Sequence, residues 1–495
     1  MICIPVIANN LDDVLRDIAE ASMVADIIEV RLDYLKNPDL KRILEGRTKP
    51  VIITNRPVRE GGKFAGSEEE RIALLKLAIQ LQADYVDIEH DSIQHISRDT
   101  AHGISTKLIV SYHNFKETPD NLISLHQKLS QYGADIVKIV SYANTITDNV
   151  KVYRLLRQAR GRVISFCMGE YGMISRILYK RFGSYLTFAS LQKGKESAPG
   201  QISIQEFLHT YQAQRQDKGT DIYGLIGNPV SHSISPIIHN TIFKEMNFNS
   251  IYVPFKVDNI GDFIRAFREL DIKGYSVTIP HKESVINHLD EIDPTAKKIG
   301  AVNTVINRNG ELVGFNTDYK AAIQVLENMS QAPDVKTGND RLKEKYVTLL
   351  GAGGAARAIS FGLQERGAQV TIVNRNFERA QSLARDVGCL SRKFEDLSGI
   401  NTDILINATP VGMFPAVHET PIDKNNLKPN MLVFDTIYNP SETRLLREAR
   451  ARGCRIVGGL PMFVNQAAAQ FELWTGIKPP LKLIEEIAFK KLVGE

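Results

Sequence analysis

The feature that most constrains the fold is a series of eight short apolar runs, rich in β-branched residues, within about the first 210 residues. Segments with a helical apolar period, such as 11–24 and 68–81, separate the runs. Because strands that alternate with helices form parallel sheets, eight such units favour a closed β/α barrel, with an open doubly wound sheet as the alternative. The expected strands are 2–8, 27–32, 51–55, 85–89, 107–112, 136–140, 162–168 and 185–189.

Ionisable side chains stand at the carboxyl ends of five of these eight runs. In a β/α barrel this end of every strand faces the active site, and an apolar strand has little other reason to end in a charge. The sequence therefore predicts an active site at this mouth of the barrel. The residues concerned are Glu29, Arg31, Arg56, Glu89, His113 and Lys138.

Lys138 lies in an almost wholly apolar strand. Burial lowers the pKa of a lysine amine, and a neutral amine can attack a ketone to form a Schiff base. The alternative is a lysine whose ammonium reaches solvent or pairs with a carboxylate. His113 and Glu89 end the two preceding strands, so we expect the carboxylate to orient the imidazole. Together the three residues predict proton abstraction beside an imine, followed by loss of a β-leaving group.

A recognisable series of segments runs through this half in order: 28–33, 55–56 with 60–62, 87–89, 111–115 with 118–119, the Lys138 strand, 172–176 and 197–201. The series resembles type I 3-dehydroquinate dehydratase, a β/α-barrel enzyme of the shikimate pathway. The resemblance implies that Lys138 forms the Schiff base with the substrate ketone, that His113 is the general acid/base and that Glu89 is its partner. It also implies substrate-binding roles for Glu29, Arg31, Arg56, Arg176, Ser197 and Gln201, with Arg176 clamping the carboxylate.

A dinucleotide fingerprint stands in the second half. The apolar strand 346–350 runs into Gly351-Ala352-Gly353-Gly354-Ala355-Ala356 and then into the helical segment 357–366. This order of strand, G-x-G-x-x-A and helix lets a pyrophosphate approach the backbone at a helix N-terminus, as in Rossmann folds. Further strands at 403–407 and 432–435 suit a parallel sheet around the cofactor.

The strand that follows the fingerprint, 369–373, favours NADP over NAD. An acidic residue at its end would hold the adenosine ribose of NAD, but this strand ends in Asn374-Arg375, with Arg379 one turn later. Two guanidinium groups suit a 2′-phosphate. The alternative is that both are surface arginines at the start of a helix.

A separate α/β unit, about 221–330, carries polar residues in its loops. Ser233 and Ser235 could simply cap a helix, and Lys282 and Asp318 could be surface charges. Taken together, however, the loops offer partners for a polyhydroxylated acid and a lysine–aspartate pair for proton transfer.

These loops and the fingerprint form a second series: 227–233, 277–282, 300–304, 316–318, 351–356, 374–375, 407–413 and 465–468. The series resembles shikimate dehydrogenase throughout. It implies that Lys282 and Asp318 are the catalytic pair and that Ser233, Ser235, Thr278, Asn303, Tyr438 and Gln466 bind substrate. It also implies cofactor contacts from Gly351, Ala352, Gly353, Gly354, Ala355, Asn374, Arg375, Arg379, Thr409, Gly459 and Met462.

Composition excludes several other classes. A net charge of +4 without runs of like charge gives no argument for nucleic acid or an anionic membrane. The four cysteines are far apart, and neither His-Glu-x-x-His nor an acidic calcium loop occurs, so we expect no metal. No apolar run approaches membrane-spanning length, and Met1 leads directly into an apolar strand without a basic leader. We therefore expect a cytoplasmic protein with small-molecule substrates; the sequence does not predict an oligomeric state.

The fused order resembles bifunctional 3-dehydroquinate dehydratase/shikimate dehydrogenases. We expect a dehydratase barrel at 1–212, a linker at 213–220, a substrate-binding domain at 221–330 completed by about 459–495, and a Rossmann NADP-binding domain at 331–458. The implied reactions convert 3-dehydroquinate to 3-dehydroshikimate and then, with NADPH, to shikimate. Two alternatives remain: the second unit could be an NAD-linked quinate dehydrogenase, or one half could be an inactive scaffold.

Overall fold

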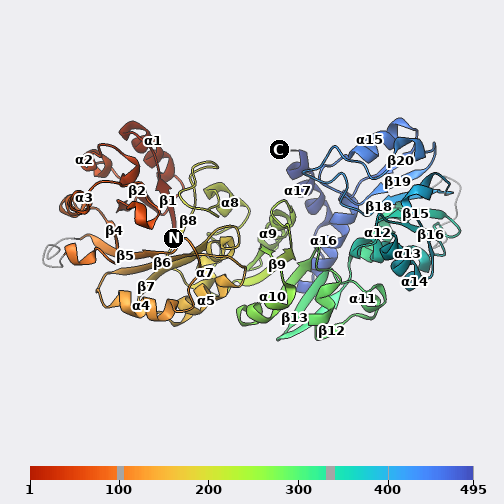
Figure 1. Cartoon of the computed structure of the whole chain (residues 1–495), viewed down its shortest axis with the longest axis horizontal. Coiled ribbons are helices and arrows are strands. Elements are labelled where there is room, and N and C mark those ends of the chain that lie inside the picture. The colour runs from red at the N-terminus through yellow and green to blue at the C-terminus, as the bar shows by residue number, and fades with distance from the viewer. Residues whose placement is uncertain (97–104, 330–340, 400, 494–495) are drawn as a thin grey trace. The chain divides into compact units, whose positions relative to one another are not determined.

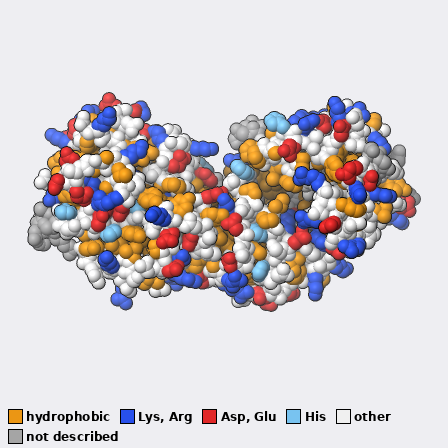
Figure 2. All heavy atoms as spheres, in the orientation of Figure 1, with side chains coloured by type: hydrophobic (Ala, Val, Ile, Leu, Met, Phe, Trp, Pro, Cys, Tyr) orange, Lys and Arg blue, Asp and Glu red, His pale blue; other side chains and the backbone are white. Residues whose placement is uncertain are grey.

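The computed structural model describes residues 1–96, 105–329, 341–399 and 401–493. The chain divides into two compact units, residues 1–222 with 247–270, and residues 223–246 with 271–495. Figure 1 shows α/β architecture in both. Acidic and basic side chains are interspersed over the visible face of each unit, as a nearly balanced composition predicts (Figure 2).

The first unit holds an eight-stranded parallel sheet in the order β7-β6-β5-β4-β3-β2-β1-β8. All eight expected strands are present. The ladder between β7 and β8 is not continuous, but Tyr185 donates its backbone N–H to the Val163 carbonyl at 2.7 Å and brings the two edges together. The sheet is therefore a nearly closed barrel, as predicted. Its strands are β1 (Ile2–Val6), β2 (Ile27–Arg31), β3 (Val51–Thr54), β4 (Tyr85–Glu89), β5 (Lys107–His113), β6 (Ile136–Tyr142), β7 (Arg162–Met168) and β8 (Thr187–Phe188).

Helices lie outside these strands (Figure 1). Local sequence fixes where the main ones begin: the Asn10 side chain caps one helix, and Ser67 and Glu70 form a reciprocal capping box at another. The helices are α1 (Leu11–Ser22), α2 (Leu40–Leu44), α3 (Glu68–Gln80), α4 (Leu122–Ser130), α5 (Asp148–Gln158), α6 (Met173–Ile177), α7 (Tyr179–Phe182) and α8 (Ile204–His209).

The barrel interior is apolar toward one end and charged toward the other. Cys3, Ile27, Ile52 and Ile109 belong to one buried apolar cluster. Side chains alternate along a strand, so the inward-facing positions continue into polar residues where the strands end. The buried polar residues at these strand ends include Glu29, Arg56, Asp87, Glu89, Ser111 and Lys138.

A six-stranded mixed sheet follows, in the order β10-β9-β11-β13-β14-β12. Its strands are β9 (Asp221–Gly227), β10 (Ser250–Lys256), β11 (Gly274–Val277), β12 (Glu291–Ile292), β13 (Thr304–Arg308) and β14 (Glu311–Phe315). The helices of this region are α9 (Ser235–Glu245), α10 (Ile260–Phe267), α11 (Pro294–Ile299) and α12 (Asp318–Met329).

The remaining sheet has six parallel strands in the order β17-β16-β15-β18-β19-β20. Renumbered from its first strand, this order is 3-2-1-4-5-6, the Rossmann topology, whose reversal point opens a crevice beside the first strand. The strands are β15 (Tyr346–Leu350), β16 (Gln369–Val373), β17 (Leu390–Arg392), β18 (Ile404–Asn407), β19 (Leu432–Asp435) and β20 (Arg455–Val457). The helices are α13 (Gly354–Glu365), α14 (Phe377–Val387) and α15 (Arg444–Ala451).

The chain then returns to the preceding mixed sheet through α16 (Leu460–Thr475), which packs on α12, and continues into α17 (Leu481–Val493). The Gln470 amide donates to the Asn303 carbonyl at 3.1 Å, and the Trp474 indole donates to the Val305 carbonyl at 3.1 Å. The last long helices are therefore part of the mixed-sheet core.

The segment 213–220 contains no helix or strand. It is nevertheless packed, because Ala213 and Gln216 are buried and Ala213 donates its N–H to the Phe207 carbonyl. Its role as a linker stays a prediction. Within the described ranges, none of the helices has the length and apolarity that crossing a bilayer requires.

Candidate active sites

The mouth of the barrel forms one cavity, and it collects nearly every residue expected there from the sequence. Its lining includes Glu29, Arg31, Arg56, His113, Lys138, Arg176, Ser197 and Gln201. Glu89 is buried and is not part of this lining. The loop that carries Ser197 and Gln201 is tight: the backbone N–H of Ser197 donates to the Gln201 side chain at 2.8 Å.

Lys138 projects from β6 into this cavity, with 6% of its side chain exposed. Its Nζ donates to Asp87 Oδ2 at 2.8 Å, lies 3.6 Å from Glu29 Oε1, and stands 4.6 Å from the centroid of the Phe188 ring. The amine is thus both buried and paired with a carboxylate. From the sequence we expected only one of these two settings.

Asp87 is a residue to which the sequence argument assigned no role. Burial by itself would raise the pKa of its carboxyl, but Arg56 and Lys138 hold that pKa well below its usual range. Asp87 therefore stays ionised and shared between two cations. Its position two residues before Glu89 on β4 puts both carboxylates on the same face of the strand, a signal that the sequence contains.

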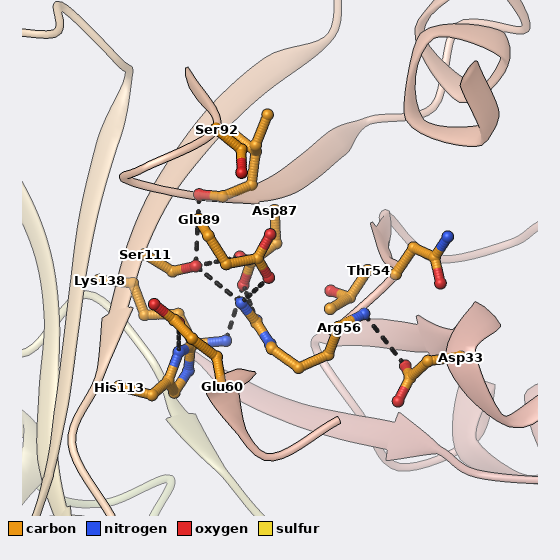
Figure 3. A network of polar contacts seen from close by, with 12 residues as sticks. Asp33, Thr54, Arg56, Glu60, Asp87, Glu89, Ser92, Ser111, His113 and Lys138 are labelled. Atoms are coloured by element: carbon orange, nitrogen blue, oxygen red, sulfur yellow. Dashed lines mark hydrogen bonds and ion pairs between the residues drawn. The ribbon is translucent and has the colours of Figure 1, made fainter. Parts of the chain in front are cut away.

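Arg56 bridges the carboxylates of Asp87 and Glu89, which lie on the same face of β4. Figure 3 shows its guanidinium pointing toward Asp87 and Glu89; it donates to Glu89 Oε1 at 2.6 Å and to Asp87 Oδ2 at 2.9 Å. The second oxygen of Glu89 accepts from the fully buried Arg71. Both oxygens of Glu89 are thus occupied by guanidinium groups.

From the sequence we expected His113 to pair with Glu89, but in the structure it pairs with Glu60. Its Nδ1 lies 2.8 Å from Glu60 Oε2 (Figure 3). In the strand register Glu89 stands opposite Ser111, so His113 extends two residues farther along β5. The turn after β3 brings Glu60 to that level, and it is so tight that a Cβ on Gly62 would lie 1.9 Å from the Arg56 carbonyl oxygen.

The electrostatics of this pair favour a neutral histidine. Burial, followed by repulsion from Arg56 and Lys138, lowers the pKa of His113 well below its ordinary value. Burial raises the pKa of Glu60 to about 8, against the opposing effect of Arg56. At neutral pH the imidazole can therefore accept a proton, and the neighbouring carboxyl can fix its orientation.

Arg176 is the most unusual residue of the cavity. It is 1% exposed, and its Nε, Nη1 and Nη2 have no hydrogen-bond partner among the residues that the structure describes. Its guanidinium lies 4.2 Å from the centroid of the Phe166 ring, and burial lowers its pKa to about 9. A buried, unpaired guanidinium in a cavity wall suits an anionic ligand such as a carboxylate.

The second expected catalytic pair is in contact. Lys282 Nζ donates to Asp318 Oδ2 at 2.5 Å, and the other oxygen of Asp318 accepts from the Asn303 amide at 2.9 Å. Asn303 is itself held by Thr317, whose backbone N–H donates to Asn303 Oδ1 at 2.7 Å. Lys282 and Thr278 also line the neighbouring cleft.

Three of the remaining expected substrate residues, Ser233, Ser235 and Tyr438, form a smaller group. The Ser233 hydroxyl lies 3.1 Å from that of Ser235 and also hydrogen-bonds to the phenol of Tyr438, whose pKa is raised by burial. Gln466 turns its amide toward the Phe463 carbonyl. Among the hydrogen bonds of the described residues, none joins the side chain of Gln466 to Ser233 or Ser235.

A cleft of about 840 Å³ lies beside the first Rossmann strand. The expected cofactor residues that line it are Gly351, Ala352, Gly353, Gly354, Ala355, Asn374, Arg375, Arg379 and Thr409. Gly459 and Met462 lie outside this lining. Met462 belongs to the apolar core of the sheet, and Gly459 packs so closely on Thr436 that a Cβ would lie 2.3 Å from its carbonyl oxygen.

The glycines of this cleft fit a dinucleotide. Gly351 has φ +117°, and a Cβ there would lie 2.9 Å from the Ala408 carbonyl oxygen. A Cβ on Gly353 would meet no atom within 4 Å, so the backbone at the start of α13 faces open space. Backbone N–H groups at a helix N-terminus are suited to a pyrophosphate. The cleft also contains Phe394, His418 and Arg444, which the sequence argument did not single out.

The described ranges contain no group of three His, Cys, Asp or Glu side chains that could hold a metal ion. The expectation that the protein needs no metal remains a prediction.

Comparison with family models divides the chain as follows. Residues 2–218 match type I 3-dehydroquinase. Residues 225–305 match the shikimate dehydrogenase substrate binding domain, residues 334–440 match shikimate / quinate 5-dehydrogenase, and residues 459–489 match the shikimate 5′-dehydrogenase C-terminal domain. Both family resemblances drawn from the sequence are thereby confirmed.

Three of the known proteins that are similar to the chain show the relationship. A chloroplastic bifunctional 3-dehydroquinate dehydratase/shikimate dehydrogenase from Arabidopsis thaliana is 43% identical, over 99% of this chain and 84% of that protein. An NADP⁺ shikimate dehydrogenase from Bacillus cereus strain AH820 is 41% identical over 55% of this chain and 99% of its own. A crystallised shikimate dehydrogenase in complex with NADP⁺ is 38% identical, with a TM-score of 0.51, over 56% of this chain and 97% of its own.

We expect Arg176→Met to stabilise the barrel. The substitution removes a buried charge that has no described partner and fills similar volume, so the free energy of unfolding should rise by about 1–4 kcal/mol. Urea denaturation followed by far-ultraviolet circular dichroism measures this change. The single tryptophan, Trp474, lies in the second unit, so its fluorescence reports that unit separately. The matched control is the exposed Arg157→Met, with an expected change in the free energy of unfolding within about 0.5 kcal/mol. If Arg176→Met destabilises the barrel, the guanidinium of Arg176 is not an uncompensated buried charge.

We also expect Glu60→Gln to flatten the pH dependence of barrel stability. The pKa of Glu60 is raised to about 8 in the folded state, so its stabilising protonation is complete below about pH 4.5 and is lost as pH rises through 8. Between about pH 6.5 and 8.5 the wild-type barrel should lose stability that the Gln variant keeps. Urea midpoints at several pH values test this, with exposed Glu69→Gln as control. Parallel pH profiles for wild type and Glu60→Gln would show that Glu60 is not perturbed.

Proposed function

The chain belongs to the family of bifunctional 3-dehydroquinate dehydratase/shikimate dehydrogenases, and on this premise we propose that it catalyses two consecutive reactions. The barrel dehydrates 3-dehydroquinate to 3-dehydroshikimate, and the second unit reduces 3-dehydroshikimate to shikimate with NADPH. The observation that carries the first step is one cavity holding a buried lysine amine, a neutral histidine and a guanidinium with no described partner.

In the dehydration, Lys138 would attack the substrate ketone once its amine has lost a proton. The carbonyl oxygen leaves as water and a protonated imine forms, which draws electrons from the adjacent C–H bond. His113 would then take that proton, because burial keeps its imidazole neutral. The electron pair expels the β-hydroxyl, to which His113 returns the proton, and a second water hydrolyses the imine to release the product.

Substrate position would depend on the charged lining of the cavity. Arg176 would bind the carboxylate, since its three nitrogens have no described partner and a bidentate ion pair would offset its burial. Glu29, Arg31, Ser197 and Gln201 would bind hydroxyl groups at the mouth. Glu60, not Glu89, would orient His113. Arg56 lies against Glu89 and Asp87, which suggests that these carboxylates position Arg56 and Lys138.

In the reduction, Lys282 and Asp318 would handle the proton at the oxygen of the reacting carbon. Their 2.5 Å contact keeps the Lys282 ammonium oriented, while Asn303 fixes the opposite oxygen of Asp318. Ser233, Ser235 and Tyr438 would bind the ring substituents. The family resemblance assigns Thr278 and Gln466 to the same substrate. The nicotinamide cofactor, when bound, supplies the hydride.

NADP is the proposed cofactor of the cleft. Gly351 to Ala355 would hold the pyrophosphate, and Arg375 with Arg379 would bind the 2′-phosphate. The names of two similar shikimate dehydrogenases include NADP⁺, which supports this choice over NAD. Contacts of Gly459 and Met462 with the nicotinamide stay an expectation from the family resemblance, because neither residue lines the cleft.

The proposed partners are the small-molecule substrates alone. A cytoplasmic location, expected from the sequence, remains a prediction, and the similar plant protein is chloroplastic. Quinate oxidation with NAD is the alternative activity for the second unit, and initial rates with shikimate and quinate, each with NADP⁺ and NAD⁺, distinguish the two.

Separate half-reactions test the proposal. On one purified sample, Lys138→Ala should reduce dehydration at least 10³-fold and leave shikimate oxidation intact, because only the first reaction needs the imine. Lys282→Ala should do the reverse. Borohydride added with 3-dehydroquinate should reduce the imine to a stable adduct on Lys138, located by peptide mass mapping. Loss of both activities in either variant, or a label elsewhere, would contradict the assignment.

A further inference from the structure

Glu283, which directly follows Lys282, contacts two arginines, of which Arg379 lines the cofactor cleft. Its Oε1 lies 3.6 Å from Arg379 Nη2, and its Oε2 lies 3.7 Å from Arg357 Nε. Glu283 and Arg379 both line the cleft that would hold the dinucleotide. A carboxylate therefore stands at the arginine proposed to bind the 2′-phosphate.

The two arginines are held very differently. The Arg357 side chain is 16% exposed, and it donates to Asp386 Oδ2 at 2.8 Å and to the Ile299 carbonyl at 3.3 Å. The Arg379 side chain is 59% exposed, and its Nη2 has a long 3.5 Å contact with the Ala352 carbonyl besides the ion pair. Arg357 is thus held by partners other than Glu283, whereas the exposed Arg379 is free to change partner.

We propose that Glu283 sets the selectivity of the cleft between phosphorylated and unphosphorylated dinucleotides, an inference that rests on the proposed NADP site. The carboxylate competes with the 2′-phosphate for Arg379 and repels the phosphate when both are near that guanidinium. A dinucleotide without the 2′-phosphate makes no such demand on Arg379. Glu283 therefore limits the preference for NADP over NAD and is a determinant of specificity that acts through Arg379.

The charge-removing substitution Glu283→Gln separates this role from a structural one. It keeps the length of the side chain and removes the negative charge that attracts both guanidinium groups. Arg357 keeps its bonds to Asp386 and to the Ile299 carbonyl, whereas Arg379 is released. The affinity for a 2′-phosphorylated nucleotide should rise about twofold to fivefold, the range expected for one exposed ion pair. The affinity for the unphosphorylated nucleotide should stay unchanged. A merely structural residue would lower both affinities together.

Isothermal titration calorimetry on the full chain, at fixed low ionic strength, measures this selectivity with 2′,5′-ADP and 5′-ADP as probes. The ratio of the two dissociation constants is compared among wild type, Glu283→Gln, Arg379→Gln and the double variant. We expect the gain from Glu283→Gln to vanish in the Arg379→Gln background, because the guanidinium for which the groups compete is gone. Glu311→Gln, an exposed glutamate on β14, controls for the change in net charge.

Each outcome is decisive. An unchanged or smaller selectivity in Glu283→Gln, or an equal gain with and without Arg379, overturns the inference. If shikimate oxidation with NADP⁺ persists alongside such a result, the proposed function stands and only the role of Glu283 fails. If the wild-type protein binds 2′,5′-ADP no better than 5′-ADP, the proposed 2′-phosphate site fails, and the inference fails with it. Binding of 5′-ADP by each variant confirms that its cleft is folded.

Discussion

The barrel site depends on charges that are buried together and must therefore satisfy one another. Asp87 is shared between Lys138 and Arg56, and Glu89 between Arg56 and Arg71, so each ion offsets the desolvation of its neighbours. This network of ion pairs fixes the Lys138 side chain in the cavity. Arg176 is not part of the network, and no described residue hydrogen-bonds to its guanidinium. A ligand therefore has most to contribute at Arg176.

In the second unit, a shorter series of hydrogen bonds holds the lysine in position. Asn303 ties Asp318 to the mixed sheet, and Asp318 orients Lys282 at the edge of the cleft. Glu283, the next residue, contacts Arg379, the arginine proposed to bind the 2′-phosphate. One loop therefore carries both a member of the proposed catalytic pair and the residue proposed to limit the preference for NADP over NAD.

Periodicity predicted the fold well because burial of strands and helices leaves a direct trace in sequence. All eight barrel strands and the Rossmann strand–glycine–helix unit lie where the pattern put them. Pairings between side chains were harder to predict. Glu89 was assigned to His113 because their strands are neighbours, yet the register sets Glu89 opposite Ser111 and lets Glu60 approach from a turn. Register and turn geometry are not encoded in strand order, so Glu60 and Asp87 were missed as partners.

Because α16 returns to the mixed sheet, the two catalytic units differ in when they can fold during synthesis on the ribosome. Barrel strands pair almost wholly with their neighbours in sequence, so that sheet can assemble as its own residues emerge. Asn303, in contrast, accepts its bond from Gln470, 167 residues later, after the whole Rossmann sheet has been made. During synthesis the dehydratase can be complete while the reductase still lacks a wall of its substrate domain. The nascent chain would then carry out the first step of its sequence before it could carry out the second.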